Sequence, residues 1–388
     1  MKDMPFGLSP RDTKEHHRVA TPLELFFDLA SVVAIATAAH GLAHAISANH
    51  TLDGLIAFVF SFFTIWWAWM NYTWFASAYD NNRPLFRIIS MIIIFGALIL
   101  AAGISELFEN RPFFFIWLGF VVMRLGQVTL WLMAARGDPV HRTTALRYAF
   151  GIAAAQIYWS CLYYGVQPGA GVFRAAFVLG ILIELAVPVF AERANPTTWH
   201  RHHIIERYGL LNIIVLGEIL LAVVTALRKT GDDVSLANPL VHVALSATII
   251  TCSLWWAYFS REEHLTSQES RRALLWGYGH VLVFAAGAAL GGGFVVLIDV
   301  LTAHAQVSLR TGDIAIAIPL AIYLAGLWFI RDRFLEGGTR RHVLLVGAGA
   351  VLFTGLFLPA ALELMTLITL VAVIVRSKAS EAHPALHE

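Results

Sequence analysis

Apolar stretches of about 18–25 residues recur along the whole length of this chain of 388 residues. An α-helix needs a stretch of that length to cross the hydrocarbon of a bilayer. Charged residues make up only 14% of the chain, whereas soluble domains carry about 25%. Because helices satisfy their own backbone hydrogen bonds in lipid, the sequence predicts an all-α polytopic membrane protein.

The pattern predicts about twelve transmembrane helices, and short connections containing Pro, Gly or Asn separate them. The last two spans meet at Leu358-Pro359, where they form two separate helices, one long kinked helix or a re-entrant pair. The predicted spans are residues 23–47, 52–75, 86–108, 112–135, 143–165, 171–191, 204–227, 239–260, 272–299, 313–332, 342–358 and 360–376.

The positions of Lys and Arg predict the orientation of the chain. If the N-terminus lies inside and the spans alternate, 21 of the 27 Lys and Arg fall on inside segments or on the inner ends of the adjoining spans. Positively charged residues concentrate on the cytoplasmic side of membrane proteins, so we predict that both termini are cytoplasmic. The polar N-terminus also lacks the apolar core of a cleaved signal peptide.

The chain has the pattern of a weak internal duplication. A helix led by Glu24 and a helix led by Glu206 are each followed by a helix that contains tryptophans. Six spans in each half would make the two repeats parallel. The tryptophan motifs are Trp66-Trp67-Ala68-Trp69 and Trp255-Trp256-Ala257-Tyr258. The predicted parts are a cytoplasmic N-terminus (1–22), two membrane halves (23–200 and 201–377) and a cytoplasmic tail (378–388).

Composition argues against several classes of function. The net charge is +1, so we expect no basic surface for nucleic acid. Cys161 and Cys252 form no CxxC pair, and we expect both to be small buried residues rather than disulfide or metal ligands. The glycines at 287 and 291–293 predict close helix packing or a helix break rather than a phosphate loop. We predict no cofactor.

Two motifs resemble those of a known family. Glu24-Leu25-Phe26-Phe27-Asp28-Leu29, with His40 sixteen positions after Glu24, resembles the opening signature of the bacterial low temperature requirement A family. The segment from Glu206 to Glu218 resembles the second signature, and the segments Trp255–Phe259 and Tyr278–His280 also fit. Ala30-Ser31 departs from the larger apolar residues that are usual there. The resemblance covers most of the chain and implies a multi-pass protein of the bacterial inner membrane, but no particular chemistry.

Acids inside the predicted spans are candidate site residues, because a carboxylate in hydrocarbon needs a partner or water. Asp28 lies one turn after Glu24, about 6 Å along the helix. Glu24 either complements the positive end of the helix, lies at the interface or has a function. Glu206 either forms a salt bridge with Arg207 and nearby histidines or has a function. Glu218 lies about 18 Å beyond Glu206, near the bilayer centre.

Other polar residues reach a similar depth. Arg124 stays charged, so we expect it to find Glu184, Glu218 or several carbonyls. Such a pair either fixes the helix register or forms a site where a proton or ion competes with the arginine. His280 in the ninth predicted span is a further candidate.

His40 and His44 lie four residues apart and face one way. Zinc would need further ligands, for which Asp299 and Glu106 are candidates, and we favour neutral histidines hydrogen-bonded between helices. His40 as part of a pH-sensitive relay is the third alternative. The tryptophans favour an aromatic belt at the membrane interface over a cage for an organic cation.

These features predict a secondary transporter of a small solute, with proton coupling through Glu218 or Asp28. The expected partners are membrane lipids and that solute or a proton. A membrane-embedded enzyme acting on a lipid or apolar substrate is the first alternative, although no HExxH motif is present. An ion channel is the second alternative. The candidate binding residues are Glu24, Asp28, His40, Arg124, Glu184, Glu206, Glu218 and His280.

Overall fold

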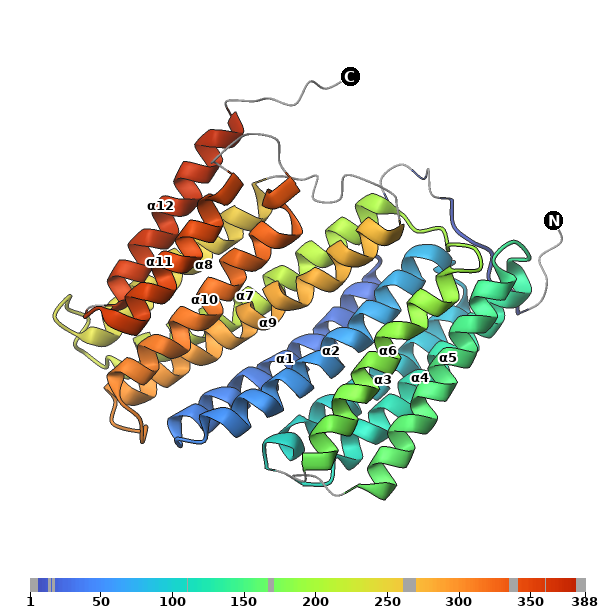
Figure 1. The fold of residues 1–388 in the computed structure, drawn as a ribbon, viewed down its shortest axis with the longest axis horizontal. Helices are drawn as coiled ribbons and strands as arrows, with labels where there is room; N and C mark the ends of the chain where they lie inside the picture. The colour runs from blue at the N-terminus through green and yellow to red at the C-terminus, as the bar shows by residue number, and fades with distance from the viewer. Residues whose placement is uncertain are drawn as a thin grey trace. The chain divides into compact units, whose positions relative to one another are not determined.

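The computed structural model describes residues 6–12, 15, 18–109, 111–166, 171–260, 270–334, 341–359 and 361–381. These residues form twelve α-helices, one short 3-10 helix and no strand, so the predicted all-α class is confirmed (Figure 1). The helices are α1 (Pro22–Ser47), α2 (Thr51–Tyr79), α3 (Pro84–Phe108), α4 (Phe114–Gly137), α5 (Arg142–Gly165), α6 (Gly171–Glu192), α7 (Arg201–Lys229), α8 (Pro239–Phe259), α9 (Ser270–Leu301), α10 (Leu309–Ile330), α11 (Val343–Phe357) and α12 (Ala361–Glu381), with the 3-10 helix η1 at Asp332–Phe334.

Within the described residues, nine helices are long and apolar enough to cross a membrane, namely α1–α4 and α6–α10. The chain is therefore a membrane protein with many apolar helices. The apolar helix α11 has only 15 residues, about 22 Å, which is shorter than the roughly 30 Å hydrocarbon layer. The two last predicted spans are separate helices, α11 and α12, that pack against each other. The count of twelve crossings remains a prediction.

Proline and short polar side chains define where several helices begin. Pro22, Pro84 and Pro239 each start a helix, at the position where a missing N–H costs nothing. The Asn238 side chain accepts a hydrogen bond from the Leu240 N–H and so caps α8. Ser308 caps α10 in the same way through the Thr311 N–H.

The chain divides into two compact units. Unit 1 comprises Met1–Ala38 and Phe60–Arg207, and unit 2 comprises Ala39–Val59 and Tyr208–Glu388. In unit 1, α3 packs against α4, α4 against α5, and α5 against α6 (Figure 1). In unit 2, α8 to α12 also pack in sequence, and α12 returns to α8, so these five helices close a ring. The predicted division into two membrane halves remains a prediction.

Three consecutive glycines allow α9 to pack closely against three helices of unit 2. A Cβ at Gly291 would lie 2.6 Å from the Glu218 Cβ of α7, and one at Gly292 would lie 2.8 Å from the Ala39 carbonyl oxygen of α1. A Cβ at Gly293 would collide with the Ala315 carbonyl oxygen of α10. Because α9 is continuous from Ser270 to Leu301, the glycines serve close packing and not a helix break.

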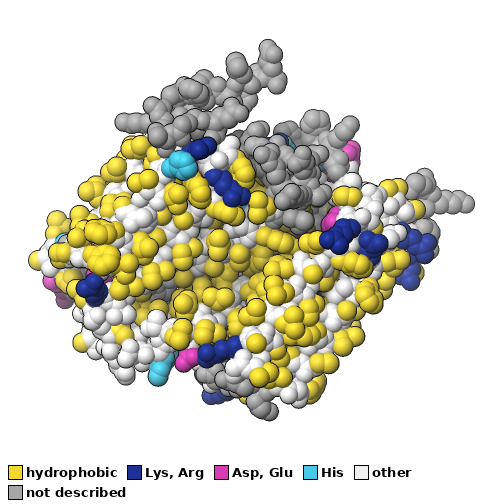
Figure 2. Space-filling model, viewed as in Figure 1, with side chains coloured by type: hydrophobic (Ala, Val, Ile, Leu, Met, Phe, Trp, Pro, Cys, Tyr) yellow, Lys and Arg dark blue, Asp and Glu magenta, His cyan; other side chains and the backbone are white. Residues whose placement is uncertain are grey.

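The visible surface is largely apolar, as Figure 2 shows. Large side chains such as Phe95 and Ile157 are more than 60% exposed, which suits a surface covered by lipid rather than water. Cys161 and Cys252 are also exposed, so the prediction that they are buried is wrong. Both lie in apolar helices, and an apolar sequence cannot tell a side chain facing lipid from one facing a helix.

Candidate functional site

Asp28 is held by three N–H donors inside unit 1. Arg207 donates to both carboxylate oxygens, from Nη1 to Oδ2 at 2.6 Å and from Nη2 to Oδ1 at 2.7 Å. The Trp69 indole N–H also donates to Oδ1, at 2.8 Å. Asp28 is 4% exposed and Arg207 is fully buried. This two-pronged geometry is the strongest form of arginine–carboxylate pairing, so Asp28 is a compensated buried acid.

Glu24 closes the first turn of α1. The Thr21 N–H donates to Glu24 Oε2 at 2.8 Å, and the Glu24 N–H donates back to Thr21 Oγ1 at 3.3 Å. This reciprocal pair is a capping box, and it satisfies two N–H groups at the start of the helix. His203 Nε2 lies 2.9 Å from Glu24 Oε1, on the other oxygen. Glu24 is completely buried, and its place relative to the membrane interface stays a prediction.

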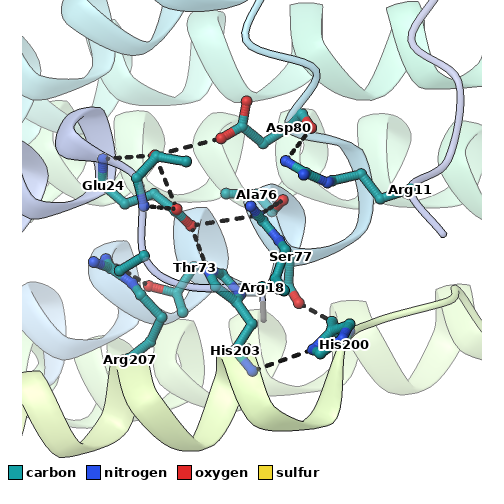
Figure 3. A network of polar contacts seen from close by, with 12 residues as sticks. Arg11, Arg18, Glu24, Thr73, Ala76, Ser77, Asp80, His200, His203 and Arg207 are labelled. Atoms are coloured by element: carbon teal, nitrogen blue, oxygen red, sulfur yellow. Dashed lines mark hydrogen bonds and ion pairs between the residues drawn. The ribbon is translucent and has the colours of Figure 1, made fainter. Parts of the chain in front are cut away.

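Residues before α1 hold the last turn of α2, as Figure 3 shows. Arg18 Nη2 donates to the Ala76 carbonyl at 3.2 Å, and Arg11 Nη1 donates to the Asp80 carbonyl at 3.0 Å. Cations are favourable at the negative end of a helix. Burial lowers the pKa of the Arg18 guanidinium, and burial raises the pKa of the Asp80 carboxyl.

Glu206 does not pair with Arg207, contrary to one alternative from the sequence. Its carboxylate accepts a hydrogen bond from the Ala20 N–H at 3.1 Å, while Arg207 pairs with Asp28. Adjacent residues on a helix point about 100° apart, so the side chain that follows Glu206 is directed to a different neighbour. Glu206 thereby ties the segment before α1 to the start of α7.

A second buried acid of unit 1, Glu184 on α6, also has three N–H donors. Arg124 on α4 donates to Oε2 at 2.9 Å, Trp67 on α2 donates to Oε2 at 2.7 Å, and Trp159 on α5 donates to Oε1 at 3.0 Å. Of the partners predicted for Arg124, the structure selects Glu184. Arg124 is 5% exposed and Glu184 is 2% exposed, so one ion pair joins four helices in the interior.

The aromatic-belt interpretation is wrong for the tryptophans of α2. Trp67 and Trp69 are at most 1% exposed and donate to buried carboxylates. An indole carries an N–H donor on a large apolar body, which suits an acid inside a helix bundle. In α8 the corresponding Trp255 and Trp256 are 52% and 39% exposed, as a belt requires.

Glu218 differs from the acids of unit 1. It lies in the middle of α7 within unit 2, is 5% exposed and packs against Gly291 of α9. Within the described residues it accepts no hydrogen bond and forms no ion pair. Six residues earlier on α7, Asn212 accepts a hydrogen bond from the Tyr323 hydroxyl at 2.8 Å. Glu218 is therefore a buried carboxyl without protein compensation.

His280 is a satisfied interior histidine. Its Nδ1 lies 2.7 Å from the Trp276 carbonyl oxygen, and its Nε2 lies 3.1 Å from the Tyr258 hydroxyl. The carbonyl can only accept, so the assigned tautomer carries its hydrogen on Nδ1 and accepts from Tyr258 at Nε2. Both ring nitrogens are occupied and the side chain is fully buried, which gives His280 a packing role in unit 2.

His40 and His44 are exposed, and neither side chain forms a hydrogen bond within the described part of the chain. The favoured interpretation of histidines bonded between helices is therefore wrong. Asp299, a candidate zinc ligand, instead accepts from Ser47 at 3.1 Å and lies 3.6 Å from Lys229. The described residues contain no group of three or more His, Cys, Asp or Glu that could hold a metal ion.

Several members of these clusters were not among the predicted site residues. The capping box was readable in the sequence, because Thr21 stands three residues before Glu24 and directly before Pro22. Arg207 was considered only as a partner for Glu206. Trp67 and Trp69 stood out as part of a motif but were interpreted as an aromatic belt. The remaining partners had no separate signal, and they are Arg18, Trp159 and His203.

Comparison with known families gives one match. Residues 19–376 match the family described as bacterial low temperature requirement A protein (LtrA). Searches of curated proteins and of solved structures found no match. The match covers nearly the whole chain, including both acid-led helices.

Proposed function

The chain belongs to the bacterial low temperature requirement A family, and from that premise we propose that it is a secondary transporter of a small solute in the bacterial inner membrane, coupled to protons. In this proposal all twelve helices cross the membrane, both termini are cytoplasmic, and the chain consists of two parallel six-helix repeats. The solute binds near the middle of the membrane, and Glu218 carries the coupling proton.

The observation that carries the proposal is the unpaired carboxyl of Glu218. Burying an ionised carboxylate without a partner costs far more than burying the neutral acid. An acid kept in the middle of an apolar helix at that cost is by default functional. The Glu218 carboxyl can hold a proton while it is packed against α9, and it can release the proton when water reaches the carboxyl. This exchange is what a proton-coupled transport cycle requires.

Helix packing supports the proposed repeat. In unit 1 the most extensive contact between helices is that of α3 with α4, and in unit 2 it is that of α9 with α10. These pairs occupy the same places in the two proposed six-helix repeats. Both contacts involve glycines, because Gly96 packs against Gly119 in the first pair and Gly293 packs against Ala315 in the second. Duplicated units that keep one packing scheme are typical of transporters with parallel repeats.

Uptake into vesicles tests the function. The purified protein is reconstituted into liposomes that contain a pH-sensitive dye, and a panel of amino acids, sugars, organic acids and organic cations is added outside. We expect at least one compound to change the internal pH, and Glu218→Gln to abolish that change. Asp232→Asn, which alters an exposed acid after α7, is the matched control and should behave like the wild type.

Infrared spectroscopy tests the protonation state without knowledge of the solute. A protonated carboxyl absorbs separately from a carboxylate, so the wild type in lipid should show a band that Glu218→Gln lacks and Asp232→Asn keeps. If Glu218→Gln retains both the band and solute-driven pH changes, Glu218 is not the proton carrier and the proposal fails.

A further inference from the structure

One end of unit 1 carries an arginine on each of three neighbouring helices. Arg136 lies in the last turn of α4, Arg142 is the first residue of α5, and Arg193 directly follows α6. The helices pack in sequence, α4 against α5 and α5 against α6. The Thr144 hydroxyl near the start of α5 donates to the Asn195 carbonyl after α6 at 2.6 Å, so the three arginines lie at the same end.

These three arginines can be reached from outside the protein. All three side chains are exposed, and none forms a hydrogen bond or an ion pair within the described residues. A guanidinium group has five N–H donors and always carries its charge. The end of α4, α5 and α6 therefore offers many free donors and three positive charges to a bound molecule.

The nearest acids in the sequence do not neutralise this end, because other donors already occupy them. Asp138 is 2% exposed and accepts from the Tyr79 hydroxyl at 3.0 Å, and its other oxygen accepts from the His141 N–H at 3.2 Å. Glu192 accepts from the Tyr148 hydroxyl at 2.8 Å. Three free arginines thus stand against two occupied carboxylates, and the surplus charge is positive. An anion is the partner that this charge favours.

An apolar strip faces outward beneath each arginine. Four and eight residues after Arg142, Leu146 and Phe150 are 43% and 69% exposed. Leu132 and Val189 stand four residues before the other two arginines, and they are 38% and 40% exposed. Residues four apart lie on the same face of a helix, so each strip leads directly to its arginine. A partner that covers both must have an anionic group joined to apolar chains.

The depth of the arginines agrees with this chemistry. Helix α4 has 24 residues, about 36 Å, and it is apolar enough to cross the roughly 30 Å hydrocarbon layer. Its last turn, which holds Arg136, therefore reaches the level of the lipid phosphate groups. The apolar strips lie at the level of the acyl chains.

We propose that an anionic phospholipid of the surrounding bilayer binds at this end of unit 1. Its phosphate accepts hydrogen bonds from Arg136, Arg142 and Arg193, and one acyl chain lies against Leu146 and Phe150. The planar guanidinium fork matches two phosphate oxygens at once. A zwitterionic lipid binds less well, because its ammonium group is repelled by the arginines. The site is separate from Glu218 and does not depend on the proposed transport function.

Competition between two lipids tests the proposal. The full chain in detergent is mixed with equal amounts of dioleoylphosphatidylglycerol and dioleoylphosphatidylcholine, which share their acyl chains and differ in head-group charge. Native mass spectrometry measures which lipid stays bound. We expect a preference of about tenfold for phosphatidylglycerol, and a smaller preference at high salt, which screens exposed charges.

A matched pair of arginine variants separates a site from general charge attraction. Arg142→Gln should lower the preference for phosphatidylglycerol about fivefold, and Arg142→Lys, which keeps the charge, should retain most of it. Arg228→Gln is the control, because Arg228 is also exposed and without a partner in the described residues but lies in the last turn of α7. It should leave the preference unchanged. Exposed side chains contribute little to folding, and gel filtration checks each variant.

Three results would overturn the proposal. Equal retention of the two lipids by the wild type would mean that the head group is not recognised. Equal losses in Arg142→Gln and Arg228→Gln would mean that any exposed arginine attracts the lipid. Displacement of bound phosphatidylglycerol by soluble glycerol phosphate at the same concentration would mean that the arginines bind free phosphates and the apolar strips contribute nothing.

Discussion

Asp28 and Glu184 of unit 1 are buried in the opposite way to Glu218 of unit 2. In unit 1, Asp28 and Glu184 each receive three N–H donors, from one arginine and from tryptophan indoles. In unit 2, Glu218 is equally buried and receives none from the described residues. A compensated acid fixes the relative positions of the helices that supply its donors, because moving any of them would leave a buried charge without its partner. An acid without donors does not hold neighbouring helices together and can change its protonation state. Burial alone therefore does not identify a functional carboxyl.

The tryptophan-containing helices α2 and α8 are alike at their C-terminal ends but differ in the direction of their tryptophans. The last carbonyls of α2 accept from Arg11 and Arg18, and the last carbonyls of α8 accept from Arg331 and Arg376. Arginines thus complement the negative helix end in both units. Only in α2 do the tryptophans turn inward to carboxylates; in α8 they face outward. The similar motifs therefore have different roles.

The largest expected effect comes from removing the partner of a compensated acid. Arg207→Gln leaves Asp28 buried and charged with only the Trp69 donor, which should cost about 3–5 kcal/mol. Glu218→Gln removes no partner and replaces a carboxyl by a neutral amide of the same shape, so the loss should be small. Thermal unfolding in detergent compares the two.

The double variant Asp28→Asn with Arg207→Gln is the control for this comparison. It removes both charges and should recover much of the stability that Arg207→Gln loses. If Glu218→Gln destabilises the protein as strongly as Arg207→Gln, Glu218 has a structural partner and the contrast between Glu218 and Asp28 is wrong.

Removing a single indole donor should have the next largest effect. Trp67→Phe takes one hydrogen bond from the buried carboxylate of Glu184 and should cost about 1.5–3 kcal/mol. Trp256→Phe, at the corresponding position of α8, changes an exposed side chain and should stay within about 0.5 kcal/mol. Equal losses in the two variants, measured by thermal unfolding, would show that Trp67 acts through packing and not through its N–H.

Adding a methyl group beside Glu218 tests how closely α9 packs against α7 around this carboxyl. Gly291→Ala places a Cβ 2.6 Å from the Glu218 Cβ, and overpacking of this kind costs about 1–3 kcal/mol. Gly349→Ala on α11, where nothing lies within 4 Å of an added Cβ, is the control and should be neutral or slightly stabilising. If Gly291→Ala is as stable as Gly349→Ala, α7 and α9 can move apart near Gly291 at little energetic cost.

The all-helical class and most helix positions could be predicted from the sequence, because hydrophobic length is a local property. The predicted alternatives included two separate helices at α11 and α12 and close helix packing by the α9 glycines, as the structure shows. The family resemblance rested on acid-led motifs, and the match over residues 19–376 confirms it.

The partners of the acids could not be predicted, since they depend on which way each side chain points. Asp28 and Arg207 are 179 positions apart, and nothing local distinguishes Arg207 from its neighbour Glu206 as the inward residue. Trp67 and Trp256 occupy matching motif positions, yet one is buried and the other exposed. Apolar faces that meet lipid and apolar faces that meet protein have the same composition, so membrane helices carry less directional information than soluble ones.

The smallest expected effect concerns Asp80, which follows α2 and lies outside the membrane-spanning segments. Burial raises its pKa in the folded protein above that of the unfolded chain, so the folded state binds the proton more tightly. The resulting stabilisation is fully present below the unfolded pKa of about 3.9 and is lost as the pH rises through the folded pKa. Asp80→Asn cannot ionise, so relative to the wild type it should be more stable at pH 7 than at pH 4.

Thermal unfolding at both pH values measures this difference, with Asp232→Asn as an exposed control that should show little change between them. The Asn82 N–H donates to Asp80 Oδ1 at 2.8 Å, and this bond favours the charged form and works against burial. If Asp80→Asn loses more stability at pH 7 than at pH 4, the hydrogen bond outweighs burial, and Asp80 belongs with the compensated acids of unit 1.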